Sequence, residues 1–189
     1  WRTHRYPGIR SDSDLFTFGY GFKPWMGKPI AAAHEILQYL GEVIDANGLA
    51  PNIRYRHAIR SAQWSSARRR WLIEAERIDE EAAGPDEPPQ TVHVSAKFLW
   101  MCQGYYRHTE GYTPQWPGME RFEGRIVHPQ TWPEDMVLDG KKVVVIGSGA
   151  TAATLIPAIA ERCAHVTMLQ RSPTFFITGR NANELADTL

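Results

Sequence analysis

The feature that most constrains the fold is a short glycine-containing segment between an apolar strand and a helical pattern. The segment reads Gly147, Ser148, Gly149, Ala150, Thr151 and Ala152. The continuous apolar run 142–146 precedes it, a helical pattern over 149–162 follows, and a second apolar stretch covers 165–170. This order predicts a β-α-β unit of an α/β fold. Pro157 lies inside the predicted helix, so we expect the helix to kink or to end early.

The spacing within this segment matches the form G-x-G-x-x-G/A, which is typical of dinucleotide-binding turns. Gly147 allows the tight turn, Gly149 lets the backbone approach a pyrophosphate, and Ala152 lets helix and strand pack closely. The helix N-terminus then offers unpaired N–H groups and a partial positive charge to the phosphates. A turn whose glycines serve only the backbone is the alternative. The flanking strand and helix favour the dinucleotide site.

The residues after the second predicted strand indicate which dinucleotide is bound. A site selective for NAD places Asp or Glu there to bind the ribose hydroxyls, whereas this chain has Arg171 and Ser172. Arg171 is suited to pair with a 2′-phosphate, and the Ser172 hydroxyl to add a hydrogen bond. The alternative is that Arg171 only covers a strand end at the surface. The position of the two residues favours NADP.

The rest of the chain shows helical and strand-like patterns of ordinary length. A helix is expected from Pro29 to Asn47-Gly48, with an apolar face formed by Ile30, Ala33, Leu37, Leu40 and Ile44. Short strands are expected at 53–59, 60–64, 70–77, 91–96 and 97–102, of which 70–77 alternates as a half-exposed antiparallel strand does. The acidic, proline-containing stretch 79–89 is predicted to be a solvated hairpin connection.

Composition excludes several functional classes. Lys plus Arg and Asp plus Glu number 21 each, so no global positive field points to nucleic acid. The histidines have no metal-ligand spacing, so no metal site is predicted. Cys102 and Cys163 are far apart and fit a reducing cytosol, each as a small buried hydrophobe. No apolar run approaches the roughly 20 residues of a membrane span. We therefore expect a cytoplasmic protein that does not bind nucleic acid, and the sequence gives no evidence of membrane spanning.

A second motif lies just upstream of the β-α-β unit. Its fixed residues are Phe122, Gly124, His128, Trp132 and Pro133. They match the pattern F-x-G-x-x-x-H-x-x-x-W-P, the fingerprint of Baeyer–Villiger monooxygenases. Related flavin monooxygenases that oxygenate nitrogen or sulfur usually replace the Trp-Pro ending. The chain thus resembles the class B flavoprotein monooxygenases of the Baeyer–Villiger type.

The resemblance extends over nearly the whole chain. Trp1 is similar to the end of the family's Gly-Gly-Thr-Trp segment, and residues 5–12 resemble its Arg-Tyr-Pro-Gly stretch beside the flavin. Residues 101–105 resemble the strand end that leads from the FAD domain into the linker. Segments 8–14 and 110–114 are most similar to the ethionamide-activating monooxygenase subgroup.

The resemblance implies two nested Rossmann-like dinucleotide-binding domains, one for FAD and one for NADP, both incomplete in this chain. On that map residues 1–120 are part of the FAD-binding domain, 121–140 form the interdomain linker with the fingerprint, and 141–189 begin the NADP-binding domain. The strands expected at 60–102 fit the antiparallel β-meander of such FAD domains. The family's N-terminal phosphate loop and its downstream flavin-supporting arginine are absent. We therefore interpret the chain, which starts at Trp1, as an internal fragment that is inactive alone.

The resemblance also implies the cofactors and the reaction. NADPH reduces FAD, and the reduced flavin takes up O2 to form a peroxide that inserts one oxygen atom into a ketone, giving an ester or lactone. One alternative is a flavin monooxygenase that oxygenates nitrogen or sulfur of small molecules, which Trp132-Pro133 argues against. A second alternative is a non-catalytic nucleotide-binding or redox-sensing protein.

Several further residues receive roles through the resemblance. Asp12 is the candidate for a catalytic carboxylate near the flavin, with solvation in a loop as the alternative. His128 is expected to bond across the domain boundary and couple NADP binding to domain rotation, or else to be structural. Trp132 is expected to pack rather than to contact substrate. Contacts to FAD are expected from Trp1, Arg10, Ser11, Asp12 and, through its backbone, Ile59.

Overall fold

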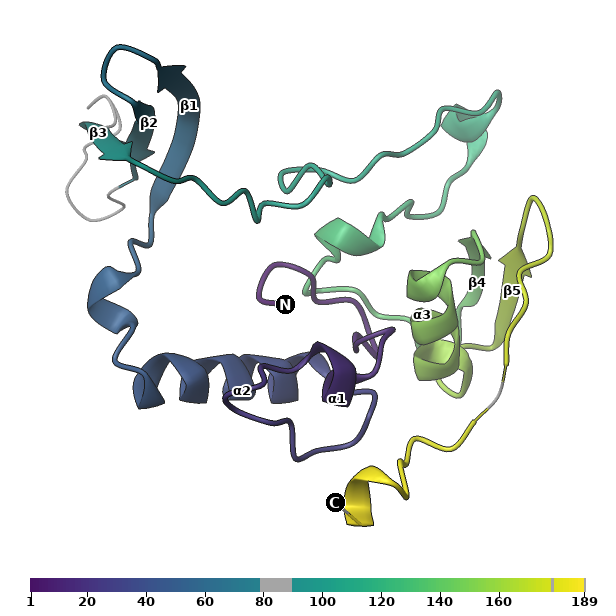
Figure 1. Cartoon of the computed structure of the whole chain (residues 1–189). Coiled ribbons are helices and arrows are strands. Elements are labelled where there is room, and N and C mark those ends of the chain that lie inside the picture. The colour runs from purple at the N-terminus through teal and green to yellow at the C-terminus, as the bar shows by residue number, and fades with distance from the viewer. Residues whose placement is uncertain (79–89, 178, 189) are drawn as a thin grey trace. The chain divides into compact units, whose positions relative to one another are not determined.

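The computed structural model describes residues 1–78, 90–177 and 179–188. The chain divides into two compact units, a larger one of Trp1–Ala46 with Tyr106–Leu189 and a smaller one of Asn47–Tyr105. Each unit contains its own sheet (Figure 1). The domain limits expected at 120 and 140 remain a prediction, and the predicted connection at 79–89 lies outside the described residues. No helix in the described part of the chain has both the length and the apolarity to cross a membrane.

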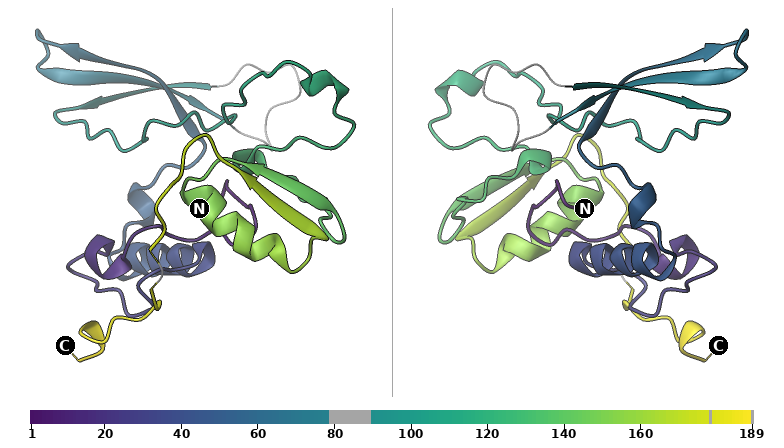
Figure 2. Two further views of the ribbon diagram at one scale, coloured as in Figure 1. Left: turned by 90° about the vertical axis from the view of Figure 1, so that its right-hand side faces the viewer. Right: turned by 90° about the vertical axis from the view of Figure 1, so that its left-hand side faces the viewer.

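The larger unit contains the predicted β-α-β unit. Strands β4 (Lys142–Ile146) and β5 (His165–Leu169) pair in parallel, from Lys142 opposite His165 to Ile146 opposite Leu169. Helix α3 (Ala150–Ala160) connects them and lies along one face of the pair (Figures 1 and 2). Leu138, Leu155 and Ile159 form the buried core between helix and strands. The α/β fold expected from the sequence is confirmed.

Helix α3 continues past the proline in its interior. It runs three residues beyond Pro157 and ends at Ala160, two residues before the predicted end at 162. An interior proline costs a helix roughly 3 kcal/mol. Leu155 and Ile159 flank it and are 4% and 0% exposed, and burying such side chains stabilises by about 1.5–3 kcal/mol each. The core contacts therefore offset the local cost.

A bidentate ion pair connects the residues that follow α3 to the turn before β4. Arg162 donates from Nη2 to Asp139 Oδ2 at 2.7 Å and from Nε to Asp139 Oδ1 at 3.2 Å. The Gly140 N–H also donates to the Arg162 carbonyl at 2.9 Å. The hydrogen bonds from Arg162 lower the pKa of Asp139 below its usual value. Both side chains are exposed, so the pair fixes the turn more than it stabilises the fold.

Helix α2 (Ala33–Ala46) begins four residues later than predicted from Pro29. Residues 30–32 pair instead with an upstream segment: Ser11 N–H donates to the Ala31 carbonyl at 2.8 Å, and Ala33 N–H donates to the Ile9 carbonyl at 3.1 Å. The Ala32 N–H donates to the Glu35 carboxylate at 2.7 Å, which caps the helix start. The extended pairing therefore outweighs the helical pattern before Ala33.

The buried face of α2 lies one residue away from the predicted one. Its buried residues are Ala33, Ile36, Tyr39 and Val43, while Leu37, Leu40 and Ile44 are half-buried. Ile36, Tyr39 and Val43 pack in one cluster with Leu15 of the short helix α1 (Leu15–Phe18) and with Trp25. The Tyr39 hydroxyl donates to the Lys23 carbonyl at 2.6 Å and accepts the Tyr20 N–H at 2.8 Å.

The smaller unit contains the predicted antiparallel meander. Its strands are β1 (His57–Ser65), β2 (Arg70–Arg77) and β3 (Gln90–Ala96), in the order β1-β2-β3. The two strands predicted at 53–59 and 60–64 are one strand, β1, with a register shift between Ile59 and Ser61. Arg56 has a φ of 57°, so the backbone is not extended at this residue. Strand β1 begins directly after it, at His57, rather than at the predicted residue 53.

The strand predicted at 97–102 is wrong. Trp71 pairs with Ala96 near the start of β2, so residues after Ala96 run past β2 and lose that partner strand. Phe98 and Trp100 are exposed there, and Cys102 is exposed rather than buried as expected. Cys163 packs against the core of the larger unit, but it is half-buried rather than buried as expected. Single 3-10 turns complete the described elements: η1 (Ala50–Asn52), η2 (Met119–Arg121), η3 (Pro129–Thr131) and η4 (Ala186–Thr188).

Candidate dinucleotide-binding turn and adjacent pocket

The glycine turn between β4 and α3 leaves open space at both glycines. Gly147 has a φ of 124°, a conformation that side chains rarely adopt, and its N–H donates to the Leu169 carbonyl at 2.8 Å. Gly149 has an ordinary φ of −80°. A Cβ placed on either glycine would meet no atom of the described residues within 4 Å. Packing within the described residues therefore does not require a glycine at position 149. A ligand that approaches the backbone closely would require one.

The start of α3 is suited to bind an anion. Gly149 is the N-cap residue and provides no side-chain cap, and the Ala153 N–H donates to its carbonyl at 3.0 Å. The preceding N–H groups of the first turn have no acceptor within the helix. Such N–H groups, together with the helix dipole, are able to bind a phosphate. Ala152 is 6% exposed, in keeping with its predicted packing role.

The ends of the two parallel strands bring the predicted specificity residues to the same sheet edge. Ile146 lies opposite Leu169, so the chain leaves β4 towards Gly147 and leaves β5 towards Arg171 at the same end. The Ser148 and Thr174 hydroxyls are 2.7 Å apart and tie the turn to the segment after β5. Arg171 and Ser172 are exposed, and Arg171 forms no ion pair among the residues that the structure describes. Thr174 was not found from the sequence, because a single exposed threonine carries no signal.

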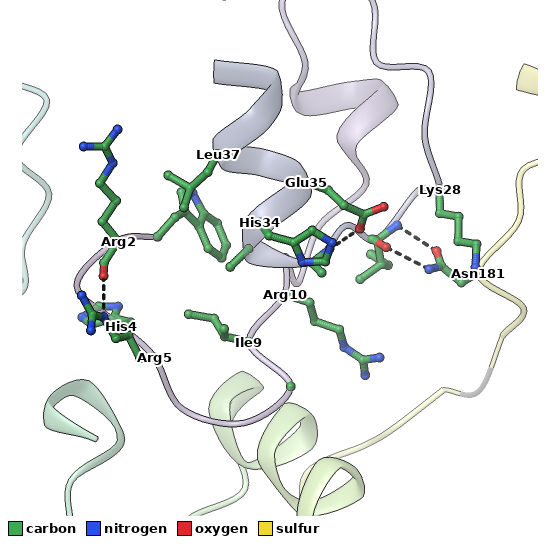
Figure 3. A pocket seen from close by; sticks show the side chains of 15 residues that line it. Arg2, His4, Arg5, Ile9, Arg10, Lys28, His34, Glu35, Leu37 and Asn181 are labelled. Carbon is green, nitrogen blue, oxygen red and sulfur yellow. Dashed lines mark hydrogen bonds between the residues drawn. The ribbon is translucent and has the colours of Figure 1, made fainter. Parts of the chain in front are cut away.

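An open pocket of about 840 Å³ lies elsewhere in the larger unit, at the start of α2. Its lining contains Trp1 and Arg10, two of the residues expected to contact FAD. Figure 3 shows Arg10 and His34 beside this pocket, with Lys28 at its edge. Glu35 also lines it, but its carboxylate accepts the Ala32 N–H. The lining is therefore predominantly basic and suited to an anionic ligand.

The other residues expected to contact FAD do not line this pocket. The Ser11 side chain is 8% exposed, and its hydroxyl oxygen accepts the Ala31 N–H at 3.1 Å, so it holds the pocket wall from behind. Asp12 is exposed and accepts the Ser13 hydroxyl at 3.2 Å. Ile59 belongs to β1 in the smaller unit, with a 61% exposed side chain. Their roles stay predictions, as does the catalytic role of Asp12.

The fingerprint residues make contacts that explain part of their spacing. A Cβ on Gly124 would collide with the Phe122 ring, so the glycine makes room for the aromatic side chain two residues earlier. Trp132 packs against the core formed by Leu155 and its neighbours, as predicted, and Pro133 follows it, half-buried. The first half of the motif thus shapes the chain around Phe122 and Gly124, and the second half packs against the β-α-β unit.

His128 has a structural role in the fold. Its Nδ1 accepts the Gln130 N–H at 3.1 Å and caps η3, which places the ring proton on Nε2. The ring lies directly against the Gly111 backbone. Gln130 donates to the Arg107 carbonyl and, at 3.3 Å, to the Glu110 carbonyl. These contacts hold residues 107–111 against the fingerprint segment. The coupling of His128 to domain rotation stays a prediction.

The titratable groups near the pocket do not form a metal site. No cluster of three His, Cys, Asp or Glu side chains with ligand geometry is found in the described ranges 1–78, 90–177 and 179–188. His4 lines the pocket, and burial lowers its pKa.

Comparison with known proteins places the chain among flavin monooxygenases. Residues 86–184 match the model of the family described as flavin-binding monooxygenase-like. The chain is 49% identical over 177 residues to the FAD-containing monooxygenase EthA of Mycolicibacterium smegmatis, covering 93% of the chain and 34% of that protein. EthA of Mycobacterium tuberculosis is 44% identical over 191 residues, covering 100% of the chain and 37% of that protein. The chain thus spans about a third of the length of these relatives.

Solved structures show the same fold. The structure of an oxidized steroid monooxygenase bound to NADP superposes with a TM-score of 0.72 and 34% identity, over 94% of this chain and 32% of that one. A cyclohexanone monooxygenase bound to ε-caprolactone gives a TM-score of 0.74 and 25% identity, over 99% of this chain and 36% of that one. With its β-α-β unit, its open glycine turn and its antiparallel meander, the chain belongs to the flavin-binding monooxygenase-like family.

Proposed function

We propose that this chain is part of an NADPH-dependent flavoprotein monooxygenase that inserts one oxygen atom of O2 into ketones to give esters or lactones. The observation that carries the proposal is the open glycine turn at the uncapped start of α3, with Arg171 at the same sheet edge. The steroid monooxygenase that shares the fold binds NADP. The fingerprint from Phe122 to Pro133 and the lactone bound in the cyclohexanone monooxygenase favour a ketone as the substrate.

The residues of the glycine turn bind and orient NADPH in this proposal. The amides at the start of α3 hold the pyrophosphate, since Gly149 leaves room for its close approach. Arg171 neutralises the 2′-phosphate, and Ser172 adds a hydrogen bond. When bound, NADPH would supply a hydride to FAD, and the reduced FAD would react with O2. The part of the protein in this reaction is to position both cofactors. The turn fits this role because, among the residues that the structure describes, no atom lies within 4 Å of a Cβ placed on Gly147 or Gly149.

The basic pocket beside α2 holds a negatively charged part of the flavin cofactor in the same proposal. Arg10 and Lys28 supply positive charge, and Trp1 supplies an aromatic wall. The buried Ser11 fixes the backbone from which Arg10 and Asp12 project. Asp12 is exposed, and its proposed task is to orient a group at the reacting flavin. The backbone contact expected from Ile59, which belongs to the smaller unit, stays a separate prediction.

The choice of dinucleotide gives the first test. We expect Arg171→Ala to raise the Kd for NADPH by about 10- to 150-fold, because hydrogen bonds to a charged group contribute about 1.5–3 kcal/mol. The Kd for NADH should change less than about twofold, since NADH has no 2′-phosphate. Titration of the product of the complete open reading frame with each nucleotide measures both values.

A matched variant separates this effect from a general loss of charge. Arg121→Ala removes another exposed arginine, on η2, and should change neither affinity. Equal weakening of NADPH and NADH by Arg171→Ala would remove Arg171 from the 2′-phosphate site.

The substrate class needs a test of its own, because the relatives are described as FAD-containing monooxygenases without a substrate. The complete enzyme, supplied with FAD, NADPH and O2, should convert a cyclic ketone to its lactone. A thioether offered in parallel tests oxygenation of sulfur. Oxidation of the thioether alone would end the ketone assignment and leave a heteroatom monooxygenase.

A further inference from the structure

The segment after β5 returns to the pocket wall and is fastened there by one side chain. The Ile30 N–H donates to Asn181 Oδ1 at 2.8 Å, and Asn181 Nδ2 donates to the Ile30 carbonyl at 2.8 Å. Figure 3 shows both hydrogen bonds ending at Asn181, beside Lys28. The two residues are 151 positions apart in the sequence. One side chain therefore satisfies both polar groups of one backbone residue.

The position of Ile30 makes this contact specific. Ile30 precedes Ala31, which pairs with Ser11 on its other side, so the side-chain amide of Asn181 continues the hydrogen bonding of this extended segment. Asparagine carries one carbonyl acceptor and two N–H donors on a short stem, whereas an ionised aspartate accepts only. Both Asn181 and Ile30 line the 840 Å³ pocket. The contact therefore belongs to the wall of the pocket.

The same segment begins with the two residues proposed to hold the 2′-phosphate. Arg171 and Ser172 follow the end of β5 and lie ten and nine residues before Asn181 in the sequence. The hydrogen bond between the Thr174 and Ser148 hydroxyls links the start of this segment to the glycine turn. An extended chain of ten residues spans up to about 33–36 Å. Attachment at β5 alone therefore does not determine whether residue 181 lies at the pocket. Asn181 fixes its other end.

We propose that Asn181 is a positioning residue that fastens the NADP-binding segment to the flavin pocket and so couples the binding of the two cofactors. The inference rests on the proposed function for the identity of the ligands, but not for the contact itself. Because coupling is reciprocal, NADP⁺ should tighten the binding of FAD by the same factor by which FAD tightens that of NADP⁺. Loss of the two hydrogen bonds should reduce this factor by about tenfold.

The test uses the product of the complete open reading frame. The Kd for FAD is measured on the deflavinated protein with and without saturating NADP⁺, and amide exchange at Ile30 is measured by NMR without cofactors. Asn181→Ala should speed exchange at Ile30 by about tenfold and reduce the coupling factor by about tenfold. Asn181→Asp, which keeps an acceptor but has no N–H donor, should also reduce the coupling. Asn183→Ala is the control, because Asn183 accepts the Ala186 N–H and should change neither value.

The outcomes separate the contact from its role. Unchanged exchange at Ile30 in Asn181→Ala would overturn the contact. Faster exchange with an unchanged coupling factor would leave Asn181 merely structural and overturn the positioning role. If the wild-type protein bound neither cofactor, the proposed function would fail and the coupling with it, and exchange at Ile30 would still decide whether Asn181 holds the segment.

Discussion

Replacing Gly8 by alanine is expected to lower the free energy of unfolding by about 2–5 kcal/mol. Gly8 has a φ of 74°, which costs an alanine roughly 1–2 kcal/mol. Its Cβ would lie 2.7 Å from the Ala158 Cβ and 2.9 Å from the Thr154 carbonyl oxygen, both on α3. The helix backbone cannot move aside as a flexible side chain would, so overpacking adds about 1–3 kcal/mol. Chemical denaturation of wild type and variant measures the sum.

Gly48→Ala is the matched control for Gly8→Ala. Gly48 also has a positive φ, 58°, but a Cβ there would meet no atom within 4 Å in the part of the chain that the structure describes. It should therefore show the conformational cost alone, about 1–2 kcal/mol. Equal destabilisation by the two substitutions would show that residues 5–10 do not pack closely on α3, and that the first part of the chain is not seated against the β-α-β unit.

Replacing Gly149 by alanine is expected to weaken NADP⁺ binding by about 30- to 150-fold while the fold is nearly unchanged. Gly149 has a φ of −80° and ψ of −175°, which alanine adopts readily, and open space surrounds its Cβ position. Loss of an N-cap glycine should lower stability by no more than about 1 kcal/mol. In the proposed complex the added methyl group occupies the path of the pyrophosphate and removes charge-assisted hydrogen bonds worth about 2–3 kcal/mol.

Gly41→Ala provides the comparison for Gly149→Ala. Gly41 lies in α2, with no atom within 4 Å of its Cβ position apart from its own helix, so the same substitution adds the same methyl group away from the turn. Isothermal titration with NADP⁺ should give a wild-type Kd for Gly41→Ala. A wild-type Kd for Gly149→Ala would mean that no phosphate lies against this glycine.

The parts of the fold that the sequence predicted are those set by neighbouring residues. The β-α-β unit is visible because an apolar strand, a glycine turn and a helical pattern follow one another from Lys142 to Leu169. The meander is visible because the alternation in 70–77 depends on the strand's own two faces. The break predicted between residues 59 and 60 marks a real irregularity, the register shift inside β1. A break in the strand pattern therefore indicates a local irregularity, but it does not show whether the strand ends there.

The parts that could not be predicted depend on partners distant in the sequence. Pairing of Ala31 with Ser11 delays the start of α2, and no property of residues 29–32 alone reveals it. Asn181 meets Ile30 across 151 residues, and an exposed asparagine has no periodicity. The candidate residues that the structure brings together, Trp1 and Arg10, were found through a family pattern. Lys28 and His34, which share their pocket, lie outside that pattern.

The central claim is that backbone amides at the start of α3 bind the pyrophosphate of NADP⁺. Hydrogen–deuterium exchange of the product of the complete open reading frame, with and without NADP⁺, tests it most directly. The account predicts that NADP⁺ slows exchange in residues 148–152, which include the N–H groups left without a partner in the helix. Binding of NADP⁺ that left exchange in 148–152 unchanged, and slowed it elsewhere, would contradict the account.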